Sequence, residues 1–156
     1  MTIILSIDPA SNKAEESNTG ITLIENGKLL DYWCLPYGVN GIREWHKKEF
    51  KKIKFDKVIF EHFEARDNSK SKDNTVLETI AEIKRLIPEA EPFRNGGYQT
   101  DVTNELLKAL GLWKFGKSHH ADVRASARLA LFYAMRNDLE DFVKGVGKRL
   151  NERIQA

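Results

Sequence analysis

The 156-residue sequence predicts an α/β domain with a mixed five-stranded sheet that helices flank. Strands one to three are predicted antiparallel, and strands four and five parallel. Two observations support this fold class: an early pair of strand patterns joined by a hairpin signal, and a later alternation of helical and strand patterns. Parallel strands need such helical crossovers between them.

The first three strands are predicted at residues 3–8, 21–25 and 28–35. Residues 3–8 show little polar alternation, which is typical of a strand covered on both faces. Asn26-Gly27 separates the next two strands. This dipeptide is the strongest short hairpin signal, because both central positions of a type I′ turn need positive φ. We therefore expect an antiparallel meander.

Two further strands are predicted downstream. Residues 55–60 contain the short buried run Val58-Ile59-Phe60, which Glu61 follows directly. Residues 91–94 fit a short fifth strand, although Pro92 weakens that prediction because proline is confined to edge strands. The fourth strand is expected to lie parallel to the first after a helical crossover.

Five helical segments complete the prediction. Asn40 is expected to cap the first, and Thr75 with Glu78 fits a capping box at the start of the second. A short helix begins at Asp101 or Thr103 and ends before Gly111. A long helix with many small residues begins near His119. A weaker helical pattern covers about residues 137–156, interrupted by Gly145 and Gly147.

Composition restricts the class of protein. The length fits one domain over residues 1–156. No apolar run reaches the roughly 18 residues that span a bilayer, so no membrane contact is expected. Cys34 is the only cysteine, which excludes an internal disulfide and fits a reducing, cytoplasmic location. The net charge of +2 does not by itself indicate a nucleic-acid binder.

Two predicted strands end on a carboxylate. Asp8 closes the first strand and Glu61 closes the fourth. If these strands are parallel neighbours, both carboxylates lie at the same end of the sheet, where clefts open in α/β folds. Asp8 can cap the following loop, as Asp commonly does, or it can bind a metal ion. A buried ionised carboxylate is costly without a compensating cation or donor.

A third acidic position lies at the start of the long helix. His119 and Asp122 are three residues apart and share one helix face. One interpretation is that Asp122 favourably meets the helix dipole and that His119 is a surface residue. Taken with Asp8 and Glu61, the same residues form a set of hard ligands suited to Mg²⁺ or Mn²⁺.

These motifs, in this order, resemble the RuvC-type Holliday-junction resolvases of the RNase H-like superfamily. The resemblance rests on three motifs: Ser6-Ile7-Asp8-Pro9 followed by Thr19-Gly20, then Ile59-Phe60-Glu61, and His119-His120-Ala121-Asp122. The element order agrees over nearly the whole chain. The short length and the loose match to cellular members favour a phage-encoded RuvC.

The resemblance implies a metal-dependent, structure-selective endonuclease that nicks branched DNA such as Holliday junctions. It implies two Mg²⁺ ions per site, for which Mn²⁺ substitutes, with Asp8 as bridging ligand and Glu61, His119 and Asp122 completing the shells. It also implies a homodimer, products with 5′-phosphate ends, and a role in DNA recombination, repair or phage DNA processing.

The chain departs from the family pattern at several points. Residues 94–107 lack the lysines that cellular members place near the site, and the loop after Asp8 is longer. Many cellular members carry Asp where this chain has His119. They also place an aromatic wedge three residues after the strand-ending Glu, where this chain has Glu64. Phe63 comes one residue earlier, and successive strand residues point to opposite faces.

DNA contacts are predicted from cations and aromatic residues near the site. Phe63 is a candidate stacking residue, as are Trp113 and Phe115. Arg124 lies on the metal-bearing helix. Four lysines on loops flank the predicted cleft: Lys70, Lys72, Lys114 and Lys117. The lysines of the first helix, which include Lys47 and Lys51, are more simply interpreted as a solvated face.

Three other functions fit parts of the pattern. Another RNase H-like nuclease would cut flaps, RNA–DNA hybrids or single strands. A branched-DNA binding protein would use the carboxylates only to hold a structural cation. An actin-like nucleotide-binding domain also begins with a strand Asp and a hairpin, but the short chain lacks a clear second Gly-rich phosphate loop.

Overall fold

The computed structural model describes residues 2–12, 18–63, 75–94, 101–116 and 120–155. Its sheet has five strands in the order β3-β2-β1-β4-β5. β1 pairs antiparallel with β2 and parallel with β4, and the outer pairs continue these senses. The strands are β1 (Ile3–Asp8), β2 (Thr19–Glu25), β3 (Lys28–Leu35), β4 (Lys57–Glu61) and β5 (Glu91–Phe93). The predicted mixed sheet is confirmed.

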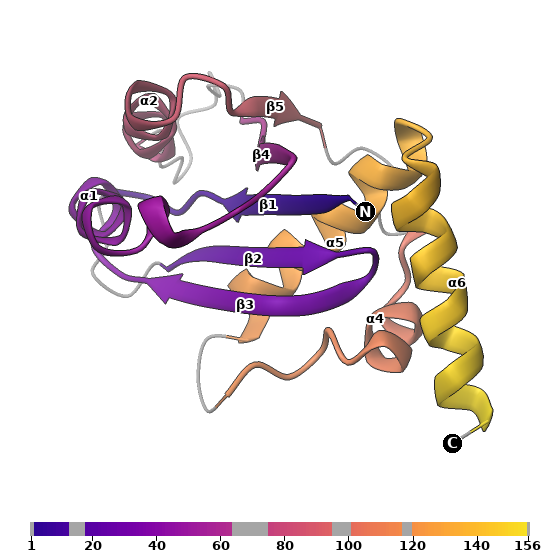
Figure 1. The fold of residues 1–156 in the computed structure, drawn as a ribbon. Helices are drawn as coiled ribbons and strands as arrows, with labels where there is room; N and C mark the ends of the chain where they lie inside the picture. The colour runs from indigo at the N-terminus through magenta and orange to yellow at the C-terminus, as the bar shows by residue number, and fades with distance from the viewer. Residues whose placement is uncertain (1, 13–17, 64–74, 95–100, 117–119, 156) are drawn as a thin grey trace.

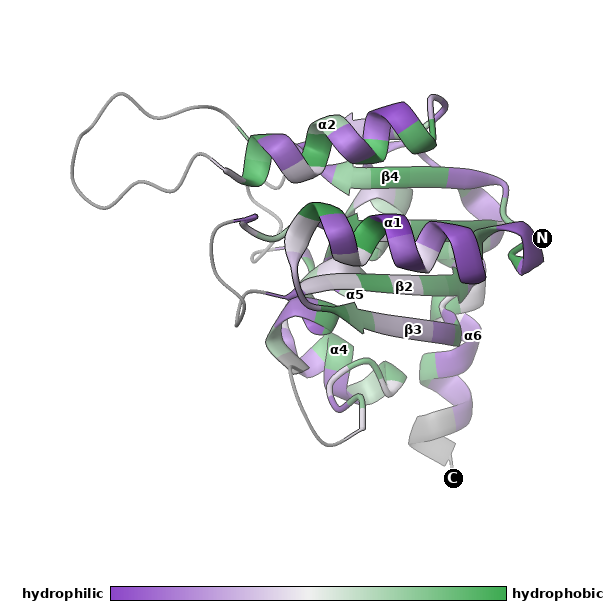
Figure 2. Ribbon diagram, turned by 90° about the vertical axis from the view of Figure 1, so that its left-hand side faces the viewer, coloured by the Kyte–Doolittle hydropathy of each residue, from purple (hydrophilic) through white to green (hydrophobic). Residues whose placement is uncertain are grey.

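Helices cover both faces of the sheet (Figure 1). α1 and α2 pack on one face, and Figure 2 shows them in front of the strands. α5 packs on the other face and is itself covered by α4 and α6. The helices are α1 (Gly38–Lys48), the short 3-10 helix η1 (Phe50–Lys52), α2 (Val76–Leu86), α4 (Asn104–Leu110), α5 (His120–Arg136) and α6 (Glu140–Gln155). No helix in the described ranges has the length and apolar character needed to cross a membrane.

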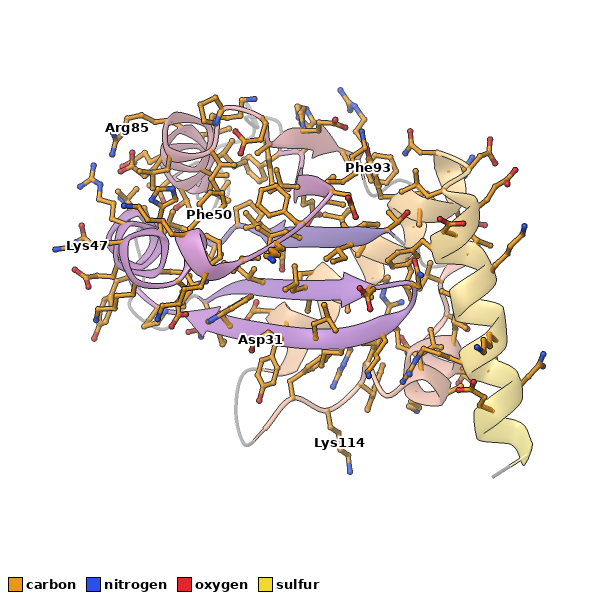
Figure 3. All side chains as sticks on the ribbon, in the orientation of Figure 1. Asp31, Lys47, Phe50, Arg85, Phe93 and Lys114 are labelled. Atoms are coloured by element: carbon orange, nitrogen blue, oxygen red, sulfur yellow. The ribbon has the colours of Figure 1, made fainter. Side chains whose placement is uncertain are left out.

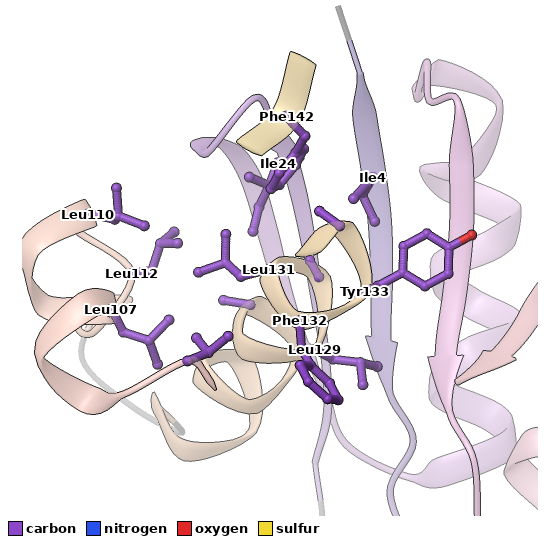
Figure 4. Close-up of a cluster of buried hydrophobic side chains, with 14 of the residues drawn as sticks. Ile4, Ile24, Leu107, Leu110, Leu112, Leu129, Leu131, Phe132, Tyr133 and Phe142 are labelled. Atoms are coloured by element: carbon purple, nitrogen blue, oxygen red, sulfur yellow. The ribbon is translucent and has the colours of Figure 1, made fainter. Parts of the chain in front are cut away.

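Strand alternation divides the core into two clusters. Leu5 and Ile7 of β1 pack against α1 and α2, whereas Ile4 packs on the α5 side. The α5-side cluster is the larger of the two, and Figure 4 shows its leucine and aromatic side chains around α5. Its helix contributes Ala127 and Ala130, which are fully buried and allow close packing on the sheet, as predicted.

The hairpin turn is confirmed, since Asn26 and Gly27 adopt φ values of 48° and 86°. The predicted break in the C-terminal helix is wrong. α6 runs continuously through Gly145, where a Cβ atom would lie 2.3 Å from the carbonyl oxygen of Asn26. This glycine therefore serves close packing of α6 on the hairpin rather than an interruption of the helix.

The predicted cap of the first helix is also wrong. α1 begins at Gly38, so Asn40 lies inside it. Tyr37 precedes the helix with a left-handed φ of 65° and makes no side-chain cap. Instead, the Oδ1 atom of Asn12 accepts from the backbone N–H of Val39 at 3.0 Å. A residue from the loop after β1 thus satisfies the helix start.

The capping box at Thr75 and Glu78 does not form. Thr75 has helical dihedral angles, φ −68° and ψ −13°, whereas a side-chain cap normally needs an extended residue. Its hydroxyl oxygen instead accepts from the Asn12 N–H at 3.0 Å, and Asn12 donates to Glu78 at 3.1 Å. Asn12 therefore ties the starts of α1 and α2 to β1. By contrast, Thr103 caps α4 as predicted.

Candidate functional site

The β1–β4 register brings two predicted site residues together. Ile7 pairs with Phe60, so Asp8 and Glu61 follow at adjacent strand ends. Alternation directs both side chains to the α5 face of the sheet, the face of Ile4 and Ile59. The carboxyl group of Glu61 lies within hydrogen-bonding reach of Asp8, and this proximity raises the pKa of Asp8.

The surroundings of Asp8 are negative. Burial is the largest cause that raises its pKa well above the ordinary 3.8. The hydrogen bond to Glu61 and the charges of Glu61 and Asp122 act in the same direction. Like charges in one site disfavour the ionised form. Asp122 therefore lies close enough to Asp8 and Glu61 for the three carboxylates to influence one another.

Gly20 places Asp122 in this site. Gly20 pairs with Asp8 on one side and with Cys34 on the other, so these residues form a row across the sheet. A Cβ atom on Gly20 would lie 2.1 Å from the carbonyl oxygen of Asp122 and 2.6 Å from the nitrogen of Val123. Only a residue without a side chain allows α5 to approach β2 this closely.

Two hydroxyl groups stabilise the contact between α5 and β2 one turn further along α5. Ser126 donates its hydroxyl to the carbonyl of Val123 at 2.9 Å and lies 3.1 Å from the hydroxyl of Thr22. Both residues are fully buried. Sequence reasoning did not single out Gly20 or Ser126 as positioning residues. The only local signal was the Thr-Gly dipeptide at the start of β2.

The pKa of Cys34, at the end of this row, is affected by the negative charge of Asp122. Burial, followed by the charge of Asp122, raises the pKa of its thiol from 9.0 to about 11. Because the thiolate is the reactive form, a raised pKa lowers the reactivity of this cysteine at neutral pH. The candidate metal ligands at this end of the sheet are the oxygen atoms of Asp8, Glu61 and Asp122.

Of the other predicted site residues, three lie within the described ranges and four lie outside them. Arg124 turns toward the carbonyl oxygen of Trp113, and Lys114 is exposed on the same loop. Phe63 is half-buried just after β4. The residues outside the described ranges are His119, Lys70, Lys72 and Lys117.

Three carboxylates at one site fit a hard divalent cation by charge and by donor type. A bound cation would offset the mutual repulsion of these carboxylates. In the described residues, however, no three His, Cys, Asp or Glu side chains already lie in a metal-holding arrangement. The donor set therefore fits Mg²⁺ chemically, and binding would require the carboxylates to turn toward the ion.

The comparisons with known proteins concern the fold. No protein-family model and no curated protein matches the chain. The structure of T. thermophilus RuvC in complex with Holliday junction substrate matches with a TM-score of 0.67 and 12% identity, over 90% of this chain and 98% of that one. A second Thermus thermophilus RuvC structure matches with a TM-score of 0.64 and 11% identity, over 88% and 96%.

At this identity the likeness shows the fold alone, and it gives no support to a phage origin. The strand order and the pairing senses agree with this match. The chain therefore has the RNase H-like fold of RuvC, with Asp8, Glu61 and Asp122 gathered on the α5 side of its sheet.

Proposed function

We propose that this chain is a divalent-metal-dependent endonuclease that nicks branched DNA such as Holliday junctions. One observation carries the proposal: Asp8, Glu61 and Asp122 come from three separate elements and interact on one face of a RuvC-like sheet. Three mutually repelling carboxylates destabilise a fold that never binds a cation. Their convergence therefore supports a site that binds cations for catalysis.

The side chains have distinct proposed roles. Asp8, at the centre of the three, would hold both metal ions, with Glu61 and Asp122 on either side of it. His119 is the fourth proposed ligand. When bound, two Mg²⁺ ions supply a water of lowered pKa and stabilise the leaving 3′ oxygen. Mn²⁺, which accepts the same oxygen ligands, is expected to substitute.

The proposed substrate determines the proposed assembly. The T. thermophilus RuvC structure contains a Holliday junction substrate, which motivates branched DNA as the substrate class here. A four-way junction has two equivalent strands to cut, so a symmetric homodimer fits it. Hydrolysis of the bond between phosphorus and the 3′ oxygen would leave a 5′-phosphate on one product and a 3′-hydroxyl on the other. Such an activity serves DNA recombination, repair or phage DNA processing.

A second candidate is a branched-DNA binding protein without nuclease activity. The observation in its favour is the structural match to T. thermophilus RuvC in complex with Holliday junction substrate, which supports junction binding whether or not the chain cleaves DNA. Another RNase H-like nuclease, acting on flaps, hybrids or single strands, would share the same carboxylates. Substrate comparison separates these alternatives.

The test is cleavage of end-labelled four-way, three-way and linear DNA with Mg²⁺ or Mn²⁺. We expect nicking of branched substrates by the wild type and a loss of more than about 100-fold in Asp8→Asn, since even an outer-shell partner of a metal ligand is worth about 10–100-fold. Asp31→Asn is the matched control, because Asp31 is an exposed carboxylate on β3 (Figure 3).

The outcomes separate the candidates. Metal-dependent nicking of four-way junctions that is lost in Asp8→Asn and kept in Asp31→Asn supports the proposal. Preferential cutting of linear single strands or hybrids identifies another RNase H-like nuclease. Binding of junctions by both proteins, with no cut under either metal, overturns the enzyme and leaves the binding protein.

A further inference from the structure

A second group of charged side chains lies outside the carboxylate site. It surrounds Trp113, on the segment that joins α4 to α5. The group consists of Lys108 near the end of α4, Trp113 and Lys114 on the segment, and Arg124 of α5, and we name it the Trp113 cluster. It combines three cations with one aromatic ring.

Arg124 contacts both the backbone and the ring of Trp113. Its Nε and Nη2 atoms donate to the Trp113 carbonyl oxygen at 3.2 Å and 2.9 Å. Its guanidinium also lies 3.5 Å from the centre of the indole ring. Stacking and hydrogen bonding together hold one orientation of the ring. Arg124 therefore acts as a positioning residue for the Trp113 ring.

The two lysines are available to a ligand. Lys108 and Lys114 are exposed, and neither has a carboxylate partner within the described part of the chain. Elsewhere on the surface Lys48 pairs with Glu44 at 3.3 Å. An open hollow of about 430 Å³ separates the lysines and is lined by Lys108, Gly111, Trp113 and Lys114. Figure 3 shows Lys114 projecting away from the fold.

The position of the cluster relative to the carboxylates decides what it could bind. Arg124 follows Asp122 by two residues, so their Cα atoms differ by only about 3 Å along the helix axis. Residues two apart do not share a helix face. The cluster thus lies level with the carboxylates but on another side of α5. The cluster is therefore placed to contact a DNA strand that extends beyond the carboxylate site, and not the phosphate that is cut there.

We propose that the Trp113 cluster is a second contact site for DNA, which takes the backbone of an unpaired strand. Lys108 and Lys114 neutralise its phosphates. Arg124 and Lys108 lie over the indole ring, at 3.5 Å and 4.7 Å from its centroid, so a base would enter the hollow against the part of the ring that lines it. Cations combined with an aromatic ring are typical of single-strand binding. Arg124 holds the ring in place. The inference shares the DNA substrate of the proposed function but does not depend on cleavage.

The first test is binding of a fluorescent oligo-dT in EDTA, with the dissociation constant measured against salt concentration. Each phosphate contact to a single strand contributes about 0.7 to the slope of log K against log salt. We expect the double variant Lys108→Ala, Lys114→Ala to reduce the slope by about 1.4. Lys47→Ala with Lys51→Ala removes the same charge from exposed lysines of α1 and η1 and should leave it unchanged.

The second test isolates the indole. The chain has three tryptophans, so Trp33→Phe with Trp45→Phe leaves Trp113 as the only tryptophan, which is then excited selectively over the tyrosines. We expect oligo-dT to quench its fluorescence and inorganic phosphate at the same charge concentration to leave it unchanged. Adding Arg124→Lys keeps the charge but removes the guanidinium group that stacks on the indole ring and donates to the Trp113 carbonyl. This change should abolish most of the quenching.

These results separate the cluster from the nuclease. Equal salt slopes for the two double variants overturn the cluster, and so does quenching by inorganic phosphate alone, which would indicate a small-anion site. Persistent quenching in Arg124→Lys overturns its positioning role. If these tests fail, junction cleavage that depends on Asp8 would still support the nuclease. If cleavage is absent, a reduced salt slope would still support the cluster. Circular dichroism confirms that each variant is folded.

Discussion

Glu82 and Asp8 are two carboxylates whose pKa values shift in opposite directions. Glu82 of α2, whose side chain is 5% exposed, bonds to Arg43 of α1 and to Arg85, whose Nη2 donates at 3.0 Å. These partners, Arg85 first, lower the pKa of Glu82 to about 2. Asp8 has acidic neighbours instead, and its pKa is raised.

The difference separates a structural charge from a functional one. Glu82 joins two helices that lie side by side on the sheet, and its charge is balanced within the fold. The charge on Asp8 is opposed by its neighbours and would be balanced by a bound cation. Strongly perturbed acids of the second kind concentrate at functional sites.

The largest expected effect comes from moving Asp122 away from Asp8. In Gly20→Ala the new methyl group meets the α5 backbone, so we expect a loss of stability of about 1–3 kcal/mol or more and at least a 100-fold loss of nicking. Thermal unfolding and junction cleavage measure both. Gly147→Ala is the control, because a Cβ there meets nothing within 4 Å and should be neutral or slightly stabilising. Wild-type behaviour in Gly20→Ala would show that the contact does not position Asp122.

Removing the charge of Asp8 should stabilise the metal-free protein. An acid whose folded pKa is raised destabilises the fold increasingly as pH rises above its ordinary value of 3.8, and not below it. We expect Asp8→Asn to gain about 0.5–2 kcal/mol at pH 7, as happens when a strained site is relieved, and nothing near pH 3. Added Mg²⁺ should raise the melting temperature of the wild type more than that of the variant. A destabilised variant at pH 7 would contradict the comparison.

Removing the charge of Glu82 should instead lower the stability of the fold at pH 7. Its lowered pKa contributes stability that is present above its ordinary value of 4.5 and is lost as pH falls toward 2. Because both arginine side chains are more than half exposed, we expect Glu82→Gln to cost only about 1 kcal/mol at pH 7. The control is Glu44→Gln, which breaks a fully surface pair with Lys48. A cost that is independent of pH would show that packing, not charge, is responsible.

The smallest effect uses Cys34 as a probe of Asp122. With a thiol pKa of about 11, alkylation by iodoacetamide at pH 8 should be slow. Asp122→Asn removes the smaller of the two causes, so we expect the rate to rise only a few-fold, while Asp31→Asn leaves it unchanged. Equal rates in all three proteins would show that the charge of Asp122 does not reach Cys34.

Local sequence patterns determined the strands, the hairpin and the two carboxylates at neighbouring strand ends. They could do so because alternation, Asn-Gly and apolar runs report backbone geometry within a few residues. The edge position of β5 also explains why Pro92 is tolerated there, since an edge strand does not need every backbone donor.

Long-range packing decided the rest. Asn12 rather than Asn40 caps α1, and Arg124 donates to the carbonyl oxygen of Trp113. Gly20 sets the distance between α5 and β2 through atoms that lie about a hundred residues apart in the chain. Such partners are chosen by the shape of the packed elements, which no short stretch of sequence encodes. The residue types at the site are local information, but their convergence is a property of the tertiary structure.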